Sequence, residues 1–288
     1  MKINRSKALD ALTDFVQVEN GVIVGIPGIG KTFILTQLVT GLIEKEVPAC
    51  LIKLEGLSEG GDSEIAALIG VKGDNWLEQL AAIPVPPSSK GVLIFDGFDA
   101  VRDETLKKRV LLQIANAKLK LPGWSIIASV RTYDALKSPR LIELFHAEYN
   151  TDGVHCRKYS IPFLTDEELE EILSSNDSLN KLYEMANAPL KQLFRVPFFL
   201  SLLDLIIAKA PGETERLSTV KSEIDLLDLY WSKVVYRIEP TLLTETFLKE
   251  LTERMVNIKQ LSVDRYDYLS GVGSAQALVA DQLLSENV

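Results

Sequence analysis

The sequence of 288 residues predicts an α/β fold, a three-layer sandwich around a parallel β-sheet, followed by a region of helices. Over the first 165 residues, short apolar runs bounded by turn residues alternate with segments of helical periodicity. The run at residues 91–96 is apolar up to its final aspartate, which is typical of a parallel strand covered on both faces. Beyond residue 165 only helical patterns follow, so a second, helical part is expected there.

The elements of the first part follow from local signals. Apolar residues at helical spacing predict an amphipathic helix over residues 5–18, and Asn20-Gly21 turns the chain into the first strand. Prolines and glycines mark the later breaks, as at Pro122-Gly123. The expected strands lie at residues 22–24, 49–54, 91–96, 124–131 and 158–162, and the expected helices at residues 31–46, 63–82 (one or two short helices) and 103–119.

The second part begins with a clear helix start. Thr165 precedes three acidic residues, and a hydroxyl cap followed by negative charge suits the positive end of a helix dipole. The further expected helices lie at residues 179–187, 196–209, 222–237, 244–258 and 274–284, with a short strand or loop at residues 262–269.

Residues 25–32, Gly-Ile-Pro-Gly-Ile-Gly-Lys-Thr, match the phosphate-binding pattern G-x-x-x-x-G-K-[ST] between a predicted strand and a predicted helix. Glycines there let several backbone N–H groups face one polyphosphate. Lys31 supplies a cation for the β- and γ-phosphates, and the Thr32 hydroxyl is a candidate Mg²⁺ ligand. A chance glycine-rich turn is the alternative, which the strand–helix context disfavours. The expected nucleotide-binding residues here are Gly25, Ile26, Pro27, Gly28, Ile29, Gly30, Lys31, Thr32 and Phe33.

Two aspartates follow the strand at residues 91–96. Asp96 stands at its carboxyl end, where a carboxylate can hold the Mg²⁺ that Thr32 also contacts. Asp99, three residues on, is close enough to orient or deprotonate a water molecule. The alternative interpretation is a simple strand-ending turn, because Asp-Gly is a common turn pair.

Arg131 ends the next inner strand, where a guanidinium can contact a γ-phosphate and report its presence. The alternative is a solvent-facing arginine that pairs with an acidic neighbour. The candidate catalytic residues are therefore Lys31, Asp99 and Arg131, and the candidate metal ligands are Thr32 and Asp96.

Five segments together resemble the NACHT branch of the STAND class of signal-transduction P-loop ATPases: GIPGIGKT, VLIFDGFDAV, IIASVRTYD, YSIPFLTDEELEEIL and RVPFFLSLLDLI. The resemblance implies a P-loop NTPase sandwich, a helical domain whose Pro197 packs on the nucleotide, and a winged-helix domain. Relatives often carry glutamate where this chain has Ala100. That departure leaves Asp99 as the water-orienting candidate and predicts slow hydrolysis.

The expected domains are an N-terminal helix (1–20), a P-loop NTPase domain (21–165), a helical domain (166–215) and an incomplete winged-helix-like domain (216–288). The resemblance implies an ATPase with ATP/ADP and Mg²⁺ as cofactors. It would act as a nucleotide-controlled switch for assembly or signalling, with defence as one implied setting. The implied partners are copies of itself or a separate effector or sensor protein.

Net charge and composition further limit the kinds of partner that we expect for this chain. The net charge of −9 disfavours a broad DNA-tracking surface. No apolar signal core and no run of about 18 apolar residues occurs, so we expect a cytoplasmic protein without a membrane partner. Cys50, Cys156 and the two histidines form no zinc-binding pattern.

Two alternative functions stay open. An AAA+-like ATPase acting on DNA would need a basic recognition helix, and the basic residues near the carboxyl end are mixed with glutamates, as at Lys249-Glu250 and Glu253-Arg254. A non-hydrolysing, nucleotide-stabilised scaffold would differ only in turnover. GTP specificity is disfavoured, because no N-K-x-D segment follows the phosphate loop at a strand end.

Overall fold

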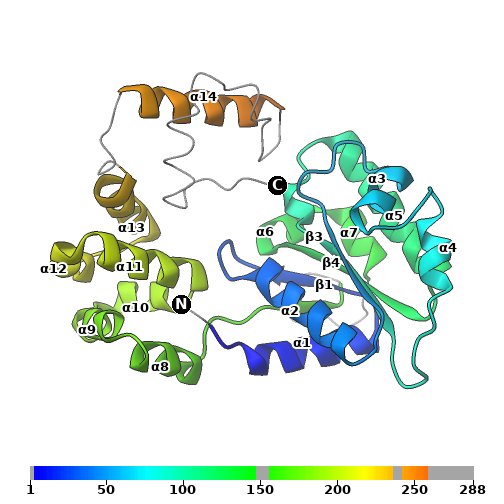
Figure 1. The fold of residues 1–288 in the computed structure, drawn as a ribbon, viewed down its shortest axis with the longest axis horizontal. Helices are drawn as coiled ribbons and strands as arrows, with labels where there is room; N and C mark the ends of the chain where they lie inside the picture. The colour runs from blue at the N-terminus through cyan, green and yellow to red at the C-terminus, as the bar shows by residue number, and fades with distance from the viewer. Residues whose placement is uncertain (1–2, 147–155, 236–241, 259–288) are drawn as a thin grey trace. The chain divides into compact units, whose positions relative to one another are not determined.

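A computed structural model of the chain describes residues 3–146, 156–235 and 242–258 (Figure 1). The chain divides into two compact units, residues 2–168 and the residues from 169 onward. The strand or loop expected at residues 262–269 and the helix expected at 274–284 lie outside the described residues. Among the helices that the structure describes, none combines the length and apolarity needed to span a membrane.

The first unit is built on five parallel strands in the spatial order β2-β3-β4-β1-β5. They are β1 (Gly21–Gly25), β2 (Ala49–Lys53), β3 (Gly91–Asp96), β4 (Trp124–Arg131) and β5 (Lys158–Ser160). All five expected strands are confirmed, with ends that differ by two residues at most. Because β4 pairs with both β1 and β3, the strand before the phosphate loop and the strand ending in Asp96 are not neighbours.

Helices cover both faces of this sheet and make a three-layer sandwich (Figure 1). They are α1 (Ser6–Val18), α2 (Lys31–Glu44), α3 (Asp62–Leu68), α4 (Trp76–Ala81), α5 (Glu104–Lys120), α6 (Thr132–Lys137) and α7 (Pro139–Leu144). Successive strand residues face opposite sides. On β4, Ile127 therefore lies in the core that includes α1 and α2, and Ile126 and Ala128 lie in the core that includes α3 to α7. The short helices α6 and α7 were not predicted, because six residues show too little periodicity.

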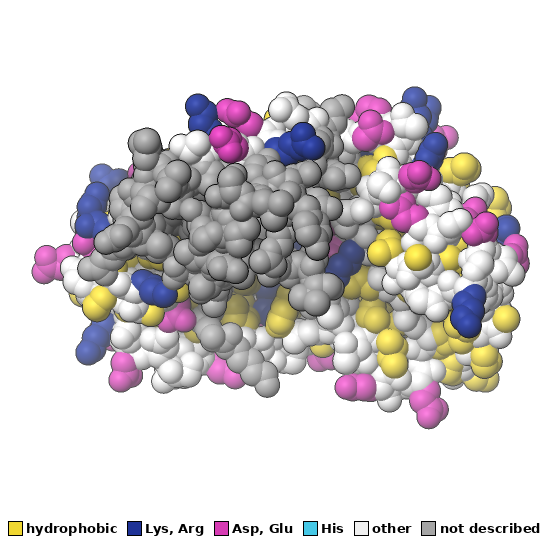
Figure 2. Space-filling model, turned by 45° about the horizontal axis from the view of Figure 1, so that its top comes forward, with side chains coloured by type: hydrophobic (Ala, Val, Ile, Leu, Met, Phe, Trp, Pro, Cys, Tyr) yellow, Lys and Arg dark blue, Asp and Glu magenta, His cyan; other side chains and the backbone are white. Residues whose placement is uncertain are grey.

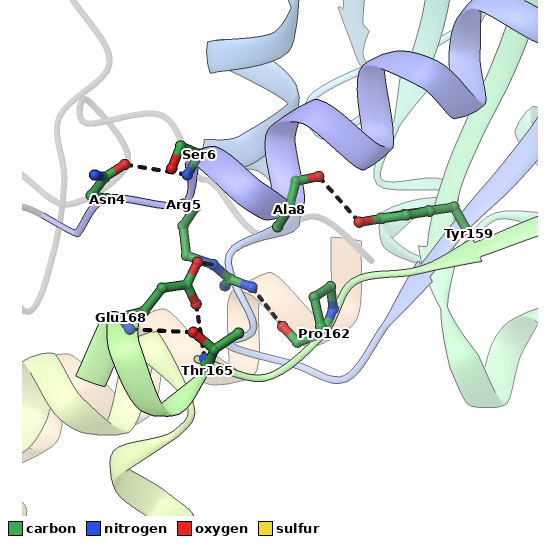
Figure 3. Close-up of polar contacts among 8 residues, drawn as sticks. All are labelled: Asn4, Arg5, Ser6, Ala8, Tyr159, Pro162, Thr165 and Glu168. Carbon is green, nitrogen blue, oxygen red and sulfur yellow. Dashed lines mark hydrogen bonds and ion pairs between the residues drawn. The ribbon is translucent and has the colours of Figure 1, made fainter. Parts of the chain in front are cut away.

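The segment before α1 is tied to the end of the first unit (Figure 3). The buried Arg5 donates from Nη2 to the Pro162 carbonyl oxygen at 2.7 Å, and its Nε lies 3.3 Å from Oε1 of Glu168. Glu168 Oε2 accepts from the Thr165 backbone N–H at 2.9 Å, and the Thr165 hydroxyl accepts from the Glu168 N–H at 3.2 Å. These reciprocal bonds form a capping box, which confirms the expected helix start.

The second unit is helical. Its elements are α8 (Asp166–Ser174, whose first residues belong to the first unit), α9 (Asp177–Met185), α10 (Ala188–Phe194), α11 (Pro197–Lys209), α12 (Thr214–Ser218), α13 (Glu223–Tyr230), a π-helical turn (Trp231–Val235) and α14 (Leu242–Ile258). The expected helices at residues 179–187, 196–209, 222–237 and 244–258 correspond to α9, α11, α13 with its π-turn, and α14. Sequence periodicity did not predict α10 and α12, which are seven and five residues long.

Candidate functional site

The loop between β1 and α2 takes its shape from its own residues. Gly28 and Gly30 have φ angles of 77° and 90°, in the left-handed region that favours glycine. A Cβ added at Gly25 would lie 2.8 Å from Cγ2 of Ile29, so no larger residue fits without a shift. Ile29 is 2% exposed and anchors the loop in the core that includes α1 and α2. Ile29 was predicted as a binding residue, but because its side chain is buried only its backbone can face a ligand.

Helix α2 begins at Lys31 with an open N-terminus. Gly30, its capping residue, has a left-handed conformation, no side chain caps the helix, and its first turn holds no acidic residue. The first N–H groups of a helix lack intrahelical partners and stand at the positive end of its dipole, so they suit an anion. The Thr32 and Phe33 side chains are exposed. The loop and the helix start together have a geometry that suits a phosphate group.

Lys31 folds back over this loop. Its Nζ donates to the carbonyl oxygens of Gly25 at 2.9 Å and Ile26 at 3.4 Å. Burial lowers the pKa of Lys31, and Arg131 acts in the same direction. Three carboxylates oppose this shift in the lysine pKa, and they belong to Asp99, Asp96 and Asp134. The ammonium group therefore shares one electrostatic environment with the residues at the ends of β3 and β4.

Asp96, the last residue of β3, is buried at 4% exposure. Its Oδ1 accepts a hydrogen bond from the hydroxyl of Ser129 on β4. The same hydroxyl oxygen accepts from the backbone N–H of Gly97 at 2.9 Å. Gly97 has a φ of 81° and turns the chain away from the strand. Asp96 is thus a strand-end carboxylate held by the neighbouring strand.

Asp99 and Arg131 form an ion pair between the turn after β3 and the end of β4. Nε of Arg131 lies 2.7 Å from Oδ2 of Asp99, and the backbone N–H of Arg131 donates to Oδ1 at 3.1 Å. The Asp99 side chain is 8% exposed and that of Arg131 is 42% exposed. Arg131 is also the register partner of Gly25. The pair therefore stands beside the phosphate loop, with Asp99 fixed and the guanidinium open to solvent.

The donor set suits a magnesium ion that is shared with phosphate. Within residues 3–146, 156–235 and 242–258, no group of three or more His, Cys, Asp or Glu side chains could hold a metal by itself. Mg²⁺ is commonly held by one or two carboxylates together with substrate phosphates and water. Asp96 and the Thr32 hydroxyl would supply the protein ligands of such a site.

Pro197 lies in the second unit, at the first position of α11. Proline is favoured at the first position of a helix, because it needs no N–H partner there and its φ is already helical. The residue is half-buried. This local role accounts for the proline, and its expected contact with a nucleotide stays a prediction.

Two residues of the site were not predicted. Ser129 lies inside the buried part of β4, and Asp134 lies in the first turn of α6. A signal for Ser129 was available, because a serine inside an otherwise apolar strand needs a buried hydrogen-bond partner. Asp134 carried no such signal, since an aspartate in the first turn of a helix is ordinary.

Comparisons with known proteins give only remote similarities. No family model and no curated protein matches the chain. Among solved structures, the ORC2 protein of Aeropyrum pernix is 12% identical with a TM-score of 0.47 over 100% of this chain and 88% of its own. A Walker-type ATPase of Pyrococcus abyssi is also 12% identical with a TM-score of 0.47, over 98% and 89% of the two chains. Hsp104 in complex with ATPγS and casein is 16% identical with a TM-score of 0.45 over 98% of this chain.

The chain spans half the length of that Hsp104 chain. At these identities and TM-scores, the fold is defined by the strand order, the helices on both faces and the phosphate loop of the chain itself. Those features make it an α/β sandwich of the P-loop NTPase type followed by a helical region, as the sequence predicts.

Proposed function

We propose that this chain is a NACHT-type ATPase in which ATP and ADP control a conformational switch for assembly or signalling. The observation that carries the proposal is the Arg131–Asp99 ion pair beside the phosphate loop. The loop N–H groups and Lys31 would bind the phosphates, and Asp96 with Thr32 would hold Mg²⁺. Bound Mg²⁺ would neutralise part of the phosphate charge.

A switch needs a group that contacts ATP and ADP differently, because a ligand shifts an equilibrium only through differential affinity. The Arg131 side chain is 42% exposed, so solvent screens its half of the ion pair, while Asp99 is 8% exposed and keeps the backbone N–H of Arg131 as a second partner. A γ-phosphate near Lys31 would then compete with Asp99 for the guanidinium of Arg131. ADP lacks this phosphate and would leave the pair intact.

Movement of Arg131 would also release Asp99. Oδ1 of Asp99 keeps the bond from the backbone N–H of Arg131, while Oδ2 loses its guanidinium partner. A carboxylate held in place with one free oxygen can orient a water molecule and accept its proton. We propose slow hydrolysis by this route, since the carboxylate is free only when the guanidinium contacts phosphate. The position after Asp99 holds Ala100 and adds no second carboxylate.

The helices after residue 168 are the proposed responsive part, and copies of this chain or a separate protein are the proposed partners. Under this proposal, the division at residues 165 and 215 separates the ATPase, helical and winged-helix-like domains. Pro197 would contact the base side of the nucleotide and respond to ATP and ADP alike. The proposed location is the cytoplasm.

The test is a pair of titrations with ATPγS and ADP on the parent and on Arg131→Ala. We expect ATPγS affinity to fall about tenfold, or about 1.4 kcal/mol, and ADP affinity to fall much less. Lys45→Ala is the matched control, because it removes one positive charge at the other end of α2, about 20 Å along the helix from Lys31. Equal losses for both nucleotides would make Arg131 a general phosphate contact.

A distance probe between residues on the sheet unit and on α13 completes the test. The parent should show different distances with ATPγS and with ADP, and Arg131→Ala should reduce that difference. If the parent shows one distance with both nucleotides but still turns over ATP, the switch is wrong and a simple ATPase remains. If it binds nucleotide without turnover and without a distance change, the scaffold alternative is supported instead.

The alternative of an ATPase acting on DNA has no specific support among the described residues. On the face shown in Figure 2, Lys and Arg side chains are scattered among Asp and Glu. On α14, the exposed Lys249 is followed directly by the exposed Glu250. A basic recognition surface would instead show clustered positive charge. A salt-dependent DNA-binding assay would test this alternative directly.

A further inference from the structure

Two buried serines on β4 differ in their partners. Ser125 and Ser129 are both fully buried, and they lie four residues apart on the same face of the strand. The hydroxyl of Ser129 bonds to Asp96 and to the backbone of Gly97. The hydroxyl of Ser125 has no hydrogen-bond partner among the described residues. Burying a hydroxyl costs free energy unless it is hydrogen-bonded, and only Ser129 has partners that offset this cost.

Strand register brings Ser129 to Asp96. Phe95 of β3 pairs with Ala128 of β4, so the next residues along the two strands are neighbours. Side chains alternate between the faces, and Ile94 and Ile127 both lie in the core that includes α1 and α2. Asp96 and Ser129, two residues further on, belong to that same face. It is the face that carries α2, the helix that begins at the phosphate loop.

The hydrogen bonds of Ser129 fix the direction of its proton. The oxygen accepts the N–H of Gly97, so the single hydroxyl proton points to Oδ1 of Asp96. This bond holds the carboxylate in one orientation. In the part of the chain that the structure describes, Oδ2 of Asp96 has no hydrogen-bond partner, and it remains available as a ligand. Groups that orient a metal ligand in this way strengthen metal binding.

We propose that Ser129 is a positioning residue that orients the Asp96 carboxylate toward the Mg²⁺ of a bound Mg²⁺–nucleotide complex. The inference rests on the proposed nucleotide-binding function and adds a residue that acts through Asp96 rather than on the nucleotide. Since β4 lies between β1 and β3, this serine also links the strand of Asp96 to the centre of the site.

The experiment measures the Mg²⁺ concentration that gives half-maximal enhancement of ATPγS binding. The variants are Ser129→Ala and, as the matched control, Ser125→Ala, which removes an equally buried hydroxyl of the same strand. We expect the required Mg²⁺ concentration to rise about tenfold in Ser129→Ala and to stay within about twofold of the parent in Ser125→Ala. ATPγS affinity in EDTA should be the same in all three proteins.

A second variant allows the proposal to be tested even if Ser129→Ala is unstable. Ser129→Cys keeps the shape of the side chain and a weak donor, so it should give an intermediate Mg²⁺ requirement. The same Mg²⁺ requirement in both serine-to-alanine variants would overturn the proposal. So would a loss of ATPγS affinity in EDTA specific to Ser129→Ala, which would indicate a distorted site. A parent that binds no ATPγS would overturn the proposed function itself and this assignment with it.

Discussion

The turn after β1 and the turn after β3 are held in their conformations in different ways. The first is shaped by residues within eight positions of one another, from the glycines at 25, 28 and 30 to Lys31, whose Nζ bonds to Gly25 and Ile26. The second is held from another strand, since Ser129 and Arg131 of β4 bond to Asp96, Gly97 and Asp99. One turn is therefore specified locally and the other by strand pairing.

The largest expected effect tests the local turn through Lys31→Ala. We expect ATPγS and ADP affinities to fall about a hundredfold or more, since each tenfold step is about 1.4 kcal/mol and the variant removes the cation facing the phosphates. The folded protein should keep its unfolding temperature. Burial lowers the pKa of Lys31, which means that the folded state disfavours its charge, so losing that charge does not cost stability.

Titration calorimetry and thermal unfolding would check this prediction, with Lys45→Ala as the control for loss of charge on the same helix. Unchanged nucleotide affinity in Lys31→Ala would remove the phosphate-loop assignment. A large fall in the unfolding temperature would show that the lysine also holds the loop together through its bonds to Gly25 and Ile26.

A smaller change in stability is expected from two glycine-to-alanine substitutions, one at the cap of α2 and one inside it, which differ in backbone conformation. Gly30 has open space around its Cβ position but a φ of 90°, so Gly30→Ala should destabilise the protein by about 1–2 kcal/mol and weaken nucleotide binding. Gly41 lies inside α2 with open space and no positive φ. Gly41→Ala should therefore stabilise the protein by about 0.5–1 kcal/mol. Chemical denaturation of both variants would measure the difference, and equal stabilities would contradict the local account of the loop.

The smallest expected effect concerns the turn held by β4. Asp99→Asn keeps an acceptor for the backbone N–H of Arg131 but removes the charge that holds its guanidinium. Loss of the Asp99 charge acts on Lys31 for both nucleotides but frees Arg131 only for ATPγS, so we expect ATPγS affinity to rise about two- to fivefold more than ADP affinity. In an Arg131→Ala background the same substitution should change both affinities alike, which a double-mutant cycle would measure.

Asp134→Asn is the control for this prediction, because Asp134 acts on Lys31 and should change the affinities of both nucleotides alike. A larger rise for ATPγS than for ADP that persists without Arg131 would show that Asp99 acts on the γ-phosphate directly. In that case the second turn would contribute its charge rather than its contact with β4.

The sequence by itself determined the phosphate loop, the five strands and the longer helices of the first unit, and the positions of Asp96, Asp99 and Arg131 at or just after strand ends. Local patterns suffice for these features, because glycine conformation, helix capping and the period of apolar residues depend on neighbours in the chain. Short helices such as α10 escaped prediction, because seven residues with one asparagine cap give little periodic signal.

Only the tertiary structure decided that β4 lies between β1 and β3, and that Ser129 and Arg131 therefore reach the carboxylates after β3. Sequence placed Arg131 and Asp99 near one site but left open whether the arginine faces a phosphate or pairs with an acidic neighbour. The physical reason is that strand order and register are set by packing across the sheet, between residues about 30 positions apart. Such contacts leave no mark on local periodicity.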